Sequence, residues 1–84
     1  NIFAGGSIRN ADSFNMGDIN YRTINNGTIN IFPGGRIEVV DSNTNQFINN
    51  GIVNNKGLII TQVGGICINN STGKIINNNG YILK

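Results

Sequence analysis

The chain has 84 residues, of which 18 are Asn, 16 Ile and 12 Gly, and its formal net charge is +2. Its six cations are scattered, so we do not expect a nucleic-acid-binding patch, and a single cysteine without any histidine excludes both an internal disulfide and a zinc cluster of the usual ligands. No apolar span reaches about 20 residues and no basic leader precedes an apolar stretch, so neither membrane insertion nor a targeting segment is expected.

Short strands separated by turns are predicted along the whole chain, because Ile, Val, Thr and Asn lower helix propensity and Gly recurs every few residues. Apolar side chains alternate in bursts that place two of them on one face of a strand, in chain order Ile29-x-Ile31, Ile37-x-Val39, Leu58-x-Ile60 and Ile66-x-Ile68. Turn-forming residues lie around these bursts, at Gly5-Gly6, Asn25-Asn26-Gly27, Asn49-Asn50-Gly51 and Asn78-Asn79-Gly80.

The opening octet NIFAGGSI returns as NIFPGGRI 29 residues later. At that offset 12 positions of residues 1–29 are identical in residues 30–58, against roughly three or four expected by chance from this composition. A weaker third copy follows and stops three residues short. We therefore predict a single repeat domain, 1–84, built from coils 1–29, 30–58 and 59–84.

An antiparallel meander is the alternative to weigh, because Asn-Gly between apolar runs is the usual signal of a β-hairpin. A meander would not keep Ile2, Ile31 and Ile60 in equivalent positions. In a solenoid, equivalent positions stack at about 4.8 Å, the distance between hydrogen-bonded strands. The sequence thus predicts an all-β parallel solenoid of about three 29-residue coils, each with two or three strands.

This offset predicts which side chains stack. The apolar core columns are Ile2/Ile31/Ile60, Ile8/Ile37/Ile66, Ile24/Val53/Ile82 and Ile29/Leu58. Two columns of asparagine are predicted to form amide ladders, Asn20/Asn49/Asn78 and Asn25/Asn54. The alternative for these asparagines is a role as turn formers with left-handed backbone, and both interpretations place them at corners.

Charged residues test the same offset. Arg9 falls over Glu38, an attraction that supports it, whereas Asp12 falls over Asp41, a repulsion that counts against it unless the carboxylates turn outward or bind a cation. The two aspartates are also the sole candidate for paired catalytic carboxylates or a calcium site. Polysaccharide-active solenoids usually have more coils and long loops, and the Gly-Gly pairs do not continue into a calcium-binding nonapeptide. We expect no enzyme activity, no metal and no cofactor.

Cys67 lies between Ile66 and Ile68 in the predicted strand. Alternation places its side chain on the outer face, where a thiol could cross-link to another chain. No histidine is present to form a Cys–His catalytic pair.

Neither end of the sequence shows a polar cap, although the ends of a solenoid otherwise leave strand edges unpaired. Either flanking coils of a longer protein or other copies of this chain would then cover them. For the second case the predicted junction residues are Asn1, Ile2, Phe3, Tyr81, Ile82, Leu83 and Lys84. Head-to-tail stacking would grow a filament with about three strand spacings per chain, roughly 14 Å.

The strings INNGTINI, FINNGIVNN and IINNNGYI resemble the Asn-Gly-Ile-rich repeats of bacterial and viral surface proteins with β-solenoid shafts, such as filamentous haemagglutinin-like adhesins. The resemblance spans most of the chain and implies an extracellular fibrous role at a cell or virion surface. The leading hypothesis is a structural fibre subunit or segment that stacks on copies of itself.

Two further hypotheses come from other functional classes. An adhesin segment would bind a surface glycan or a host receptor through its faces, with Tyr21, Tyr81 and Phe14 as candidate contacts. A fragment of a polysaccharide-active enzyme would depend on Asp41.

Overall fold

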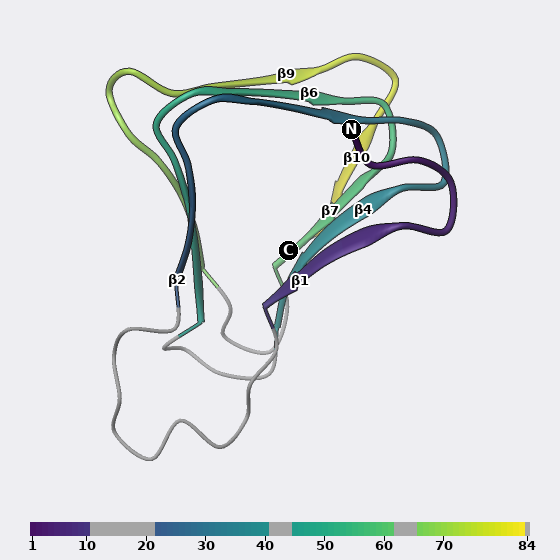
Figure 1. Ribbon diagram of the computed structural model, residues 1–84, viewed down its shortest axis with the longest axis horizontal. Coiled ribbons are helices and arrows are strands. Elements are labelled where there is room, and N and C mark those ends of the chain that lie inside the picture. The colour runs from purple at the N-terminus through teal and green to yellow at the C-terminus, as the bar shows by residue number, and fades with distance from the viewer. Residues whose placement is uncertain (11–21, 41–44, 62–65, 84) are drawn as a thin grey trace.

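The computed structural model describes residues 1–10, 22–40, 45–61 and 66–83. In these residues the backbone winds around three sides, and Figure 1 looks down the axis of the winding. Successive coils lie on one another, and the strand pairs between them are parallel. The predicted all-β parallel solenoid of about three coils is confirmed, and each coil has three sides.

Each side is one parallel sheet that takes a strand from every coil. Side 1 contains β1 (Ser7–Asn10), β4 (Arg36–Val39), β7 (Leu58–Ile60) and β10 (Tyr81–Leu83). Side 2 contains β2 (Arg22–Asn25), β5 (Gln46–Asn49) and β8 (Ile66–Asn69). Side 3 contains β3 (Thr28–Ile31), β6 (Ile52–Asn55) and β9 (Lys74–Asn77).

The core lies on the axis, where each strand contributes alternate side chains. Ile37, Phe47 and Val53 are buried in the middle coil, one from each side. The first and third coils stack a residue on each of these, namely Ile8 and Ile59, Thr23 and Cys67, and Ile29 and Ile75. A core of this size is small for an 84-residue chain, and backbone hydrogen bonds between coils supplement it.

The constant 29-residue offset is wrong beyond the first sheet pair. It holds where Ile8 pairs with Ile37 and where Ile2 bridges to Ile31, but sides 2 and 3 pair the first two coils 24 residues apart. The next coil follows at 20 to 22 residues. The connection from β1 to β2 explains the difference, because it has eleven residues against six from β4 to β5 and five from β7 to β8.

The predicted core columns change partners as a result. Ile24 illustrates the reason: a shift of one residue moves a side chain to the opposite face of a strand, and Ile24 lies on the outer face, 51% exposed. The corrected neighbours are Ile31 on Asn55 instead of Ile60, Ile37 on Ile59 instead of Ile66, Ile24 on Ile48 instead of Val53, Val53 between Ile29 and Ile75, Ile82 on Ile59, and Leu58 on Arg36 instead of Ile29.

The outward position predicted for Cys67 is also wrong. Its side chain is half-buried and packs against the core, in the column of Phe47. The flanking Ile68 takes the outer position that alternation requires. Other sequence predictions concern residues outside the described part of the chain: Asp12, Phe14, Asn20, Tyr21, Asp41 and Lys84.

Candidate assembly surfaces

Two ladders of asparagine side chains run inside the solenoid at its corners. On side 2, Nδ2 of Asn25 donates to Oδ1 of Asn49 at 2.9 Å, and Nδ2 of Asn49 donates to Oδ1 of Asn69 at 2.9 Å. On side 3, Nδ2 of Asn55 donates to Oδ1 of Asn77 at 3.0 Å. Both ladders therefore donate toward the third coil.

Each inner asparagine also holds the corner that follows it. Oδ1 of Asn49 accepts the backbone N–H of Gly51 at 3.2 Å, and its Nδ2 reaches the carbonyl of Lys74 in the next coil at 3.1 Å. The Asn55 amide repeats the pattern with Gly57 and Tyr81. One side chain thus turns the backbone and joins two coils, which requires a donor and an acceptor at a short fixed reach.

Two outer ladders lie beside these and donate in the opposite direction, toward the first coil. The corner ladder consists of Asn26, Asn50 and Asn70, and the ladder on the face of side 3 consists of Asn1, Asn30 and Asn54. Their bonds include 2.9 Å from Nδ2 of Asn50 to Oδ1 of Asn26 and 2.8 Å from Nδ2 of Asn54 to Oδ1 of Asn30. These side chains are more exposed than the buried Asn49 and Asn55.

Asparagine ladders were predicted and are present, but with other partners. Asn49 stacks between Asn25 and Asn69 rather than with Asn20 and Asn78, and Asn54 stacks on Asn30 rather than on Asn25. The partners follow the corrected offsets.

Glycine at the corners lets the coils approach closely. A Cβ added to Gly51 would meet the carbonyl oxygen of Gly27 in the coil before it, and one added to Gly73 would meet that of Asn49. Gly27, in the first coil, faces no atom within 4 Å. Stacking of a coil, rather than the turn itself, therefore makes a side chain costly at these corners.

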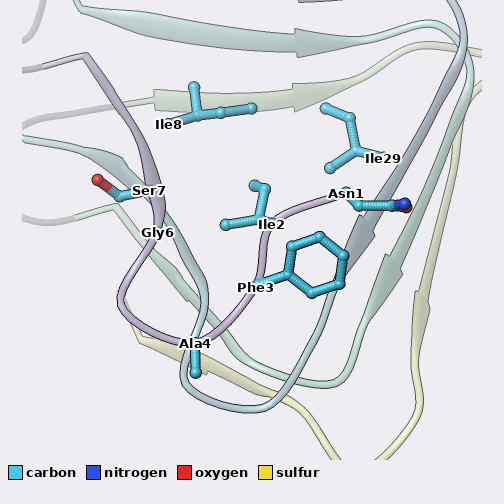
Figure 2. Close-up of a pocket in the computed structure, with 8 residues that line it drawn as sticks. All are labelled: Asn1, Ile2, Phe3, Ala4, Gly6, Ser7, Ile8 and Ile29. Atoms are coloured by element: carbon cyan, nitrogen blue, oxygen red, sulfur yellow. The ribbon is translucent and has the colours of Figure 1, made fainter.

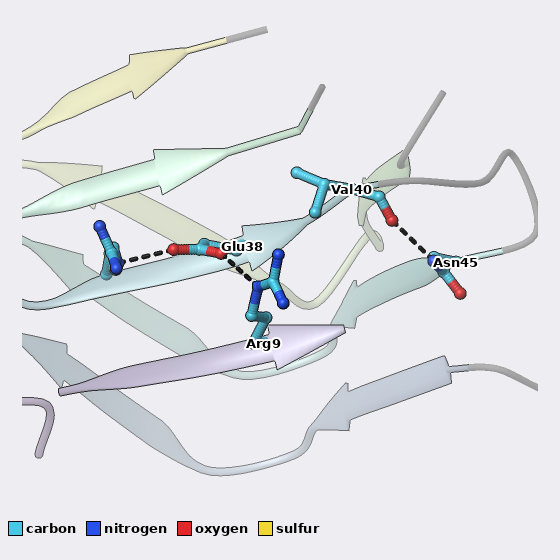
Figure 3. Close-up of polar contacts among 5 residues, drawn as sticks. Arg9, Glu38, Val40 and Asn45 are labelled. Carbon is cyan, nitrogen blue, oxygen red and sulfur yellow. Dashed lines mark hydrogen bonds and ion pairs between the residues drawn. The ribbon is translucent and has the colours of Figure 1, made fainter. Parts of the chain in front are cut away.

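The outer face of side 1 holds a carboxylate between two guanidinium groups (Figure 3). Nε of Arg9 donates to Oε2 of Glu38 at 2.7 Å, and Nε of Arg36 lies 2.6 Å from Oε1. The carboxylate side chain is only 10% exposed, because the two arginines cover it. The predicted stacking of Arg9 on Glu38 is confirmed.

The end of the solenoid at the first coil leaves its interior open. A hollow there is lined by Ile2, Ile8 and Ile29, from three separate segments, and Figure 2 shows these side chains with Phe3 beside them. The Phe3 ring stacks on Phe32 with centroids 5.0 Å apart, and 62% of Phe3 is exposed. The predicted junction residues Asn1, Ile2 and Phe3 all line this hollow.

The opposite end is open as well. A hollow of about 200 Å³ lies there among Ile59, Ile75 and Ile82, with Cys67 and the inner amide Asn69 at its wall. Ile82 is 39% exposed although it stands in the interior column of side 1. Of the other predicted junction residues, Tyr81 lies on β10 and is 63% exposed, and Leu83 ends the same strand.

No membrane-length apolar helix is found in the described residues, and no group of three or more His, Cys, Asp or Glu side chains there could hold a metal ion. Searches of family models, of curated proteins and of solved structures found no match to this chain.

Proposed function

We propose that this chain is a structural unit of an extracellular or virion-surface fibre, and that it grows by stacking copies of itself head to tail. The observation that carries the proposal is the open apolar interior at both ends, with Ile8 at one and Ile82 at the other. Exposed apolar surface of this kind, next to unpaired strand edges, favours addition of a further coil. The resemblance to Asn-Gly-Ile-rich surface repeats supports the extracellular location.

The two ends match in chemistry. Ile8, Ile37, Ile59 and Ile82 form one interior column on side 1, so β1 of a second copy placed on β10 would continue that column with its own Ile8. Such a contact keeps all strands parallel, as they are within the chain. The contact joins two different surfaces and is therefore open-ended, which produces a filament rather than a dimer.

The strand count sets the repeat of such a fibre. Side 1 has four strands in its sheet, so each copy would advance by four strand spacings, about 19 Å, instead of the three predicted from the 29-residue offset. Side 2 has three strands, so one strand position would stay open between β8 and β2 of the next copy.

Electron microscopy and fibre diffraction of the 84-residue chain over a range of concentrations test the proposal. We expect uniform filaments above a critical concentration, with a strand reflection near 4.8 Å and an axial repeat of about 19 Å. A chain that stays monomeric and folded at millimolar concentration would contradict it.

Ile82→Lys should block assembly, because it places an ammonium group in the apolar junction while the free end still lets that group reach water. Ile76→Lys is the matched control: Ile76 is 48% exposed on β9 but lies on the outer face. The critical concentration should rise at least tenfold for the first variant and stay within twofold for the second. Equal effects would count against stacking at this end.

A binding module is the second candidate, favoured by the exposure of Tyr81 and Phe3, at 63% and 62%. An adhesin segment would use such aromatic side chains against a glycan or a host surface. Binding to a glycan array that Tyr81→Ala abolishes, by a chain that forms no filaments, would favour this function over the fibre.

A further inference from the structure

We infer that the outer face of side 2 is a lateral contact through which one fibre of this chain packs against a second fibre of the same chain. The inference rests on the proposed function, because it concerns how fibres associate once they have formed.

The face carries a continuous apolar column. Ile24, Ile48 and Ile68 pair with one another in register, one from each coil, so the column repeats at every strand spacing. Ile24 is 51% exposed at the end of the column, and the other two are half-buried by their neighbours within it. The column lies outward, since the positions before it in each strand, occupied by Phe47 and Cys67 in the second and third coils, pack in the core.

Strands β5 and β8 thus place apolar side chains on both faces. Parallel strands with this pattern are typical of sheets that are covered on both sides, and one side of this sheet is already covered by the core. The outer face is the one that lacks a cover among the described residues.

The other two sides differ in the chemistry of their outer faces. Side 1 presents the ion pairs of Glu38 with Arg9 and Arg36, and side 3 presents the amide ladder through Asn30 and Asn54. Packing those faces against an apolar partner would bury charged and amide groups, which is costly. Side 2 is therefore the face best suited to apolar contact.

The size of the face indicates the partner. Three strands about 4.8 Å apart and four residues long at about 3.3 Å each give roughly 190 Å² of footprint, against about 800 Å² per partner in a stable interface. One chain is thus too small to hold a lateral partner, whereas a fibre offers the same column in every copy and reaches that area within about four to five copies. The partner that matches such a periodic column is another fibre with the same spacing.

The β-branched side chains suit this contact because isoleucine is restricted at χ1 and loses little freedom when it is covered. Lateral pairing should consequently follow fibre growth rather than precede it.

Mass per length, measured by scanning transmission electron microscopy on fibres of the wild-type chain, tests the inference. We expect two chains per axial repeat, and one chain per repeat for the triple variant Ile24→Thr, Ile48→Thr and Ile68→Thr, a twofold drop. Threonine keeps the branched shape and the strand preference while making the face polar. A second variant, Ile48→Arg, places a charge at the centre of the column and should halve the mass per length in the same way.

The matched control is Ile76→Thr, which makes the same change on the outer face of side 3 and should leave two chains per repeat. Single wild-type fibres, or paired fibres in both side-2 variants, would overturn the lateral contact while leaving head-to-tail growth in place. Failure of the wild-type chain to form any fibre would overturn the proposed function, and the lateral contact with it.

Discussion

Asn49 and Asn50 are neighbours in the chain, and they belong to two ladders with opposite properties. Asn49 is buried and its amide bonds to side chains above and below it and to the backbone of its own corner and of the next coil. Asn50 lies outside, where its amide bonds to the asparagines of the adjacent coils. The inner amides donate toward the third coil and the outer amides toward the first.

The comparison teaches that the residue type does not fix the contribution of an asparagine to this fold. An inner amide must satisfy its own polar atoms and those of the turn without water, so each bond it loses leaves a buried group unpaired. An outer amide can exchange its ladder bonds for bonds to water at little cost. The opposed directions of the two kinds of ladder also set their side-chain dipoles against each other along the axis.

Replacing Asn49 by Asp should have the largest effect. The carboxylate cannot donate to Asn69 or to the backbone carbonyls, and it places a charge in the core, so we expect a loss of about 3 kcal/mol or more in the free energy of unfolding. Chemical denaturation at a fixed chain concentration measures this. Acid pH should restore part of the loss, because the protonated carboxyl regains a donor.

Asn50→Asp is the matched control, and its loss should stay within about 1 kcal/mol, since water reaches the site. Similar losses in the two variants would show that the inner and outer ladders do not differ as described.

A second pair of variants separates stacking from turning. Gly51→Ala puts a methyl group against the carbonyl of Gly27, and we expect it to cost about 2 kcal/mol through displacement of one coil from the next. Gly27→Ala makes the same change at the equivalent corner of the first coil, where there is open space, and should change stability by less than about 1 kcal/mol in the unassembled chain. Denaturation below the critical concentration checks both, and a larger loss for Gly27→Ala would reverse the interpretation.

The corner residues also show how much of this fold the sequence predicts. Parallel coils, asparagine ladders and the stacking of Ile8 on Ile37 follow from periodicity, because identical residues in solenoid coils occupy equivalent positions. The offset did not transfer to sides 2 and 3. A self-comparison finds one offset, whereas the connection from β1 to β2 is longer than its counterparts in the next coils.

The error was hard to detect because each coil has two similar corners. Asn49-Asn50-Gly51 and Asn55-Lys56-Gly57 flank a single four-residue strand, so a shift by one strand and one turn still aligns asparagine with asparagine. The inward or outward position of Ile24 and Cys67 depends on that register residue by residue. The open ends follow from no local pattern, since they are defined by which strands lack a neighbour.

Glu38 extends the comparison to an outer residue that is nevertheless buried. Glu38→Gln should cost about 1 kcal/mol, because the amide keeps the shape and one acceptor but leaves two guanidinium groups without a counter-charge. The arginine side chains are more than half exposed, so salt should screen much of the attraction. We therefore expect the difference between variant and wild type to shrink in 1 M salt, as measured by denaturation with urea. A difference that is insensitive to salt would mean that the hydrogen bonds rather than the charges of this cluster hold β1 against β4.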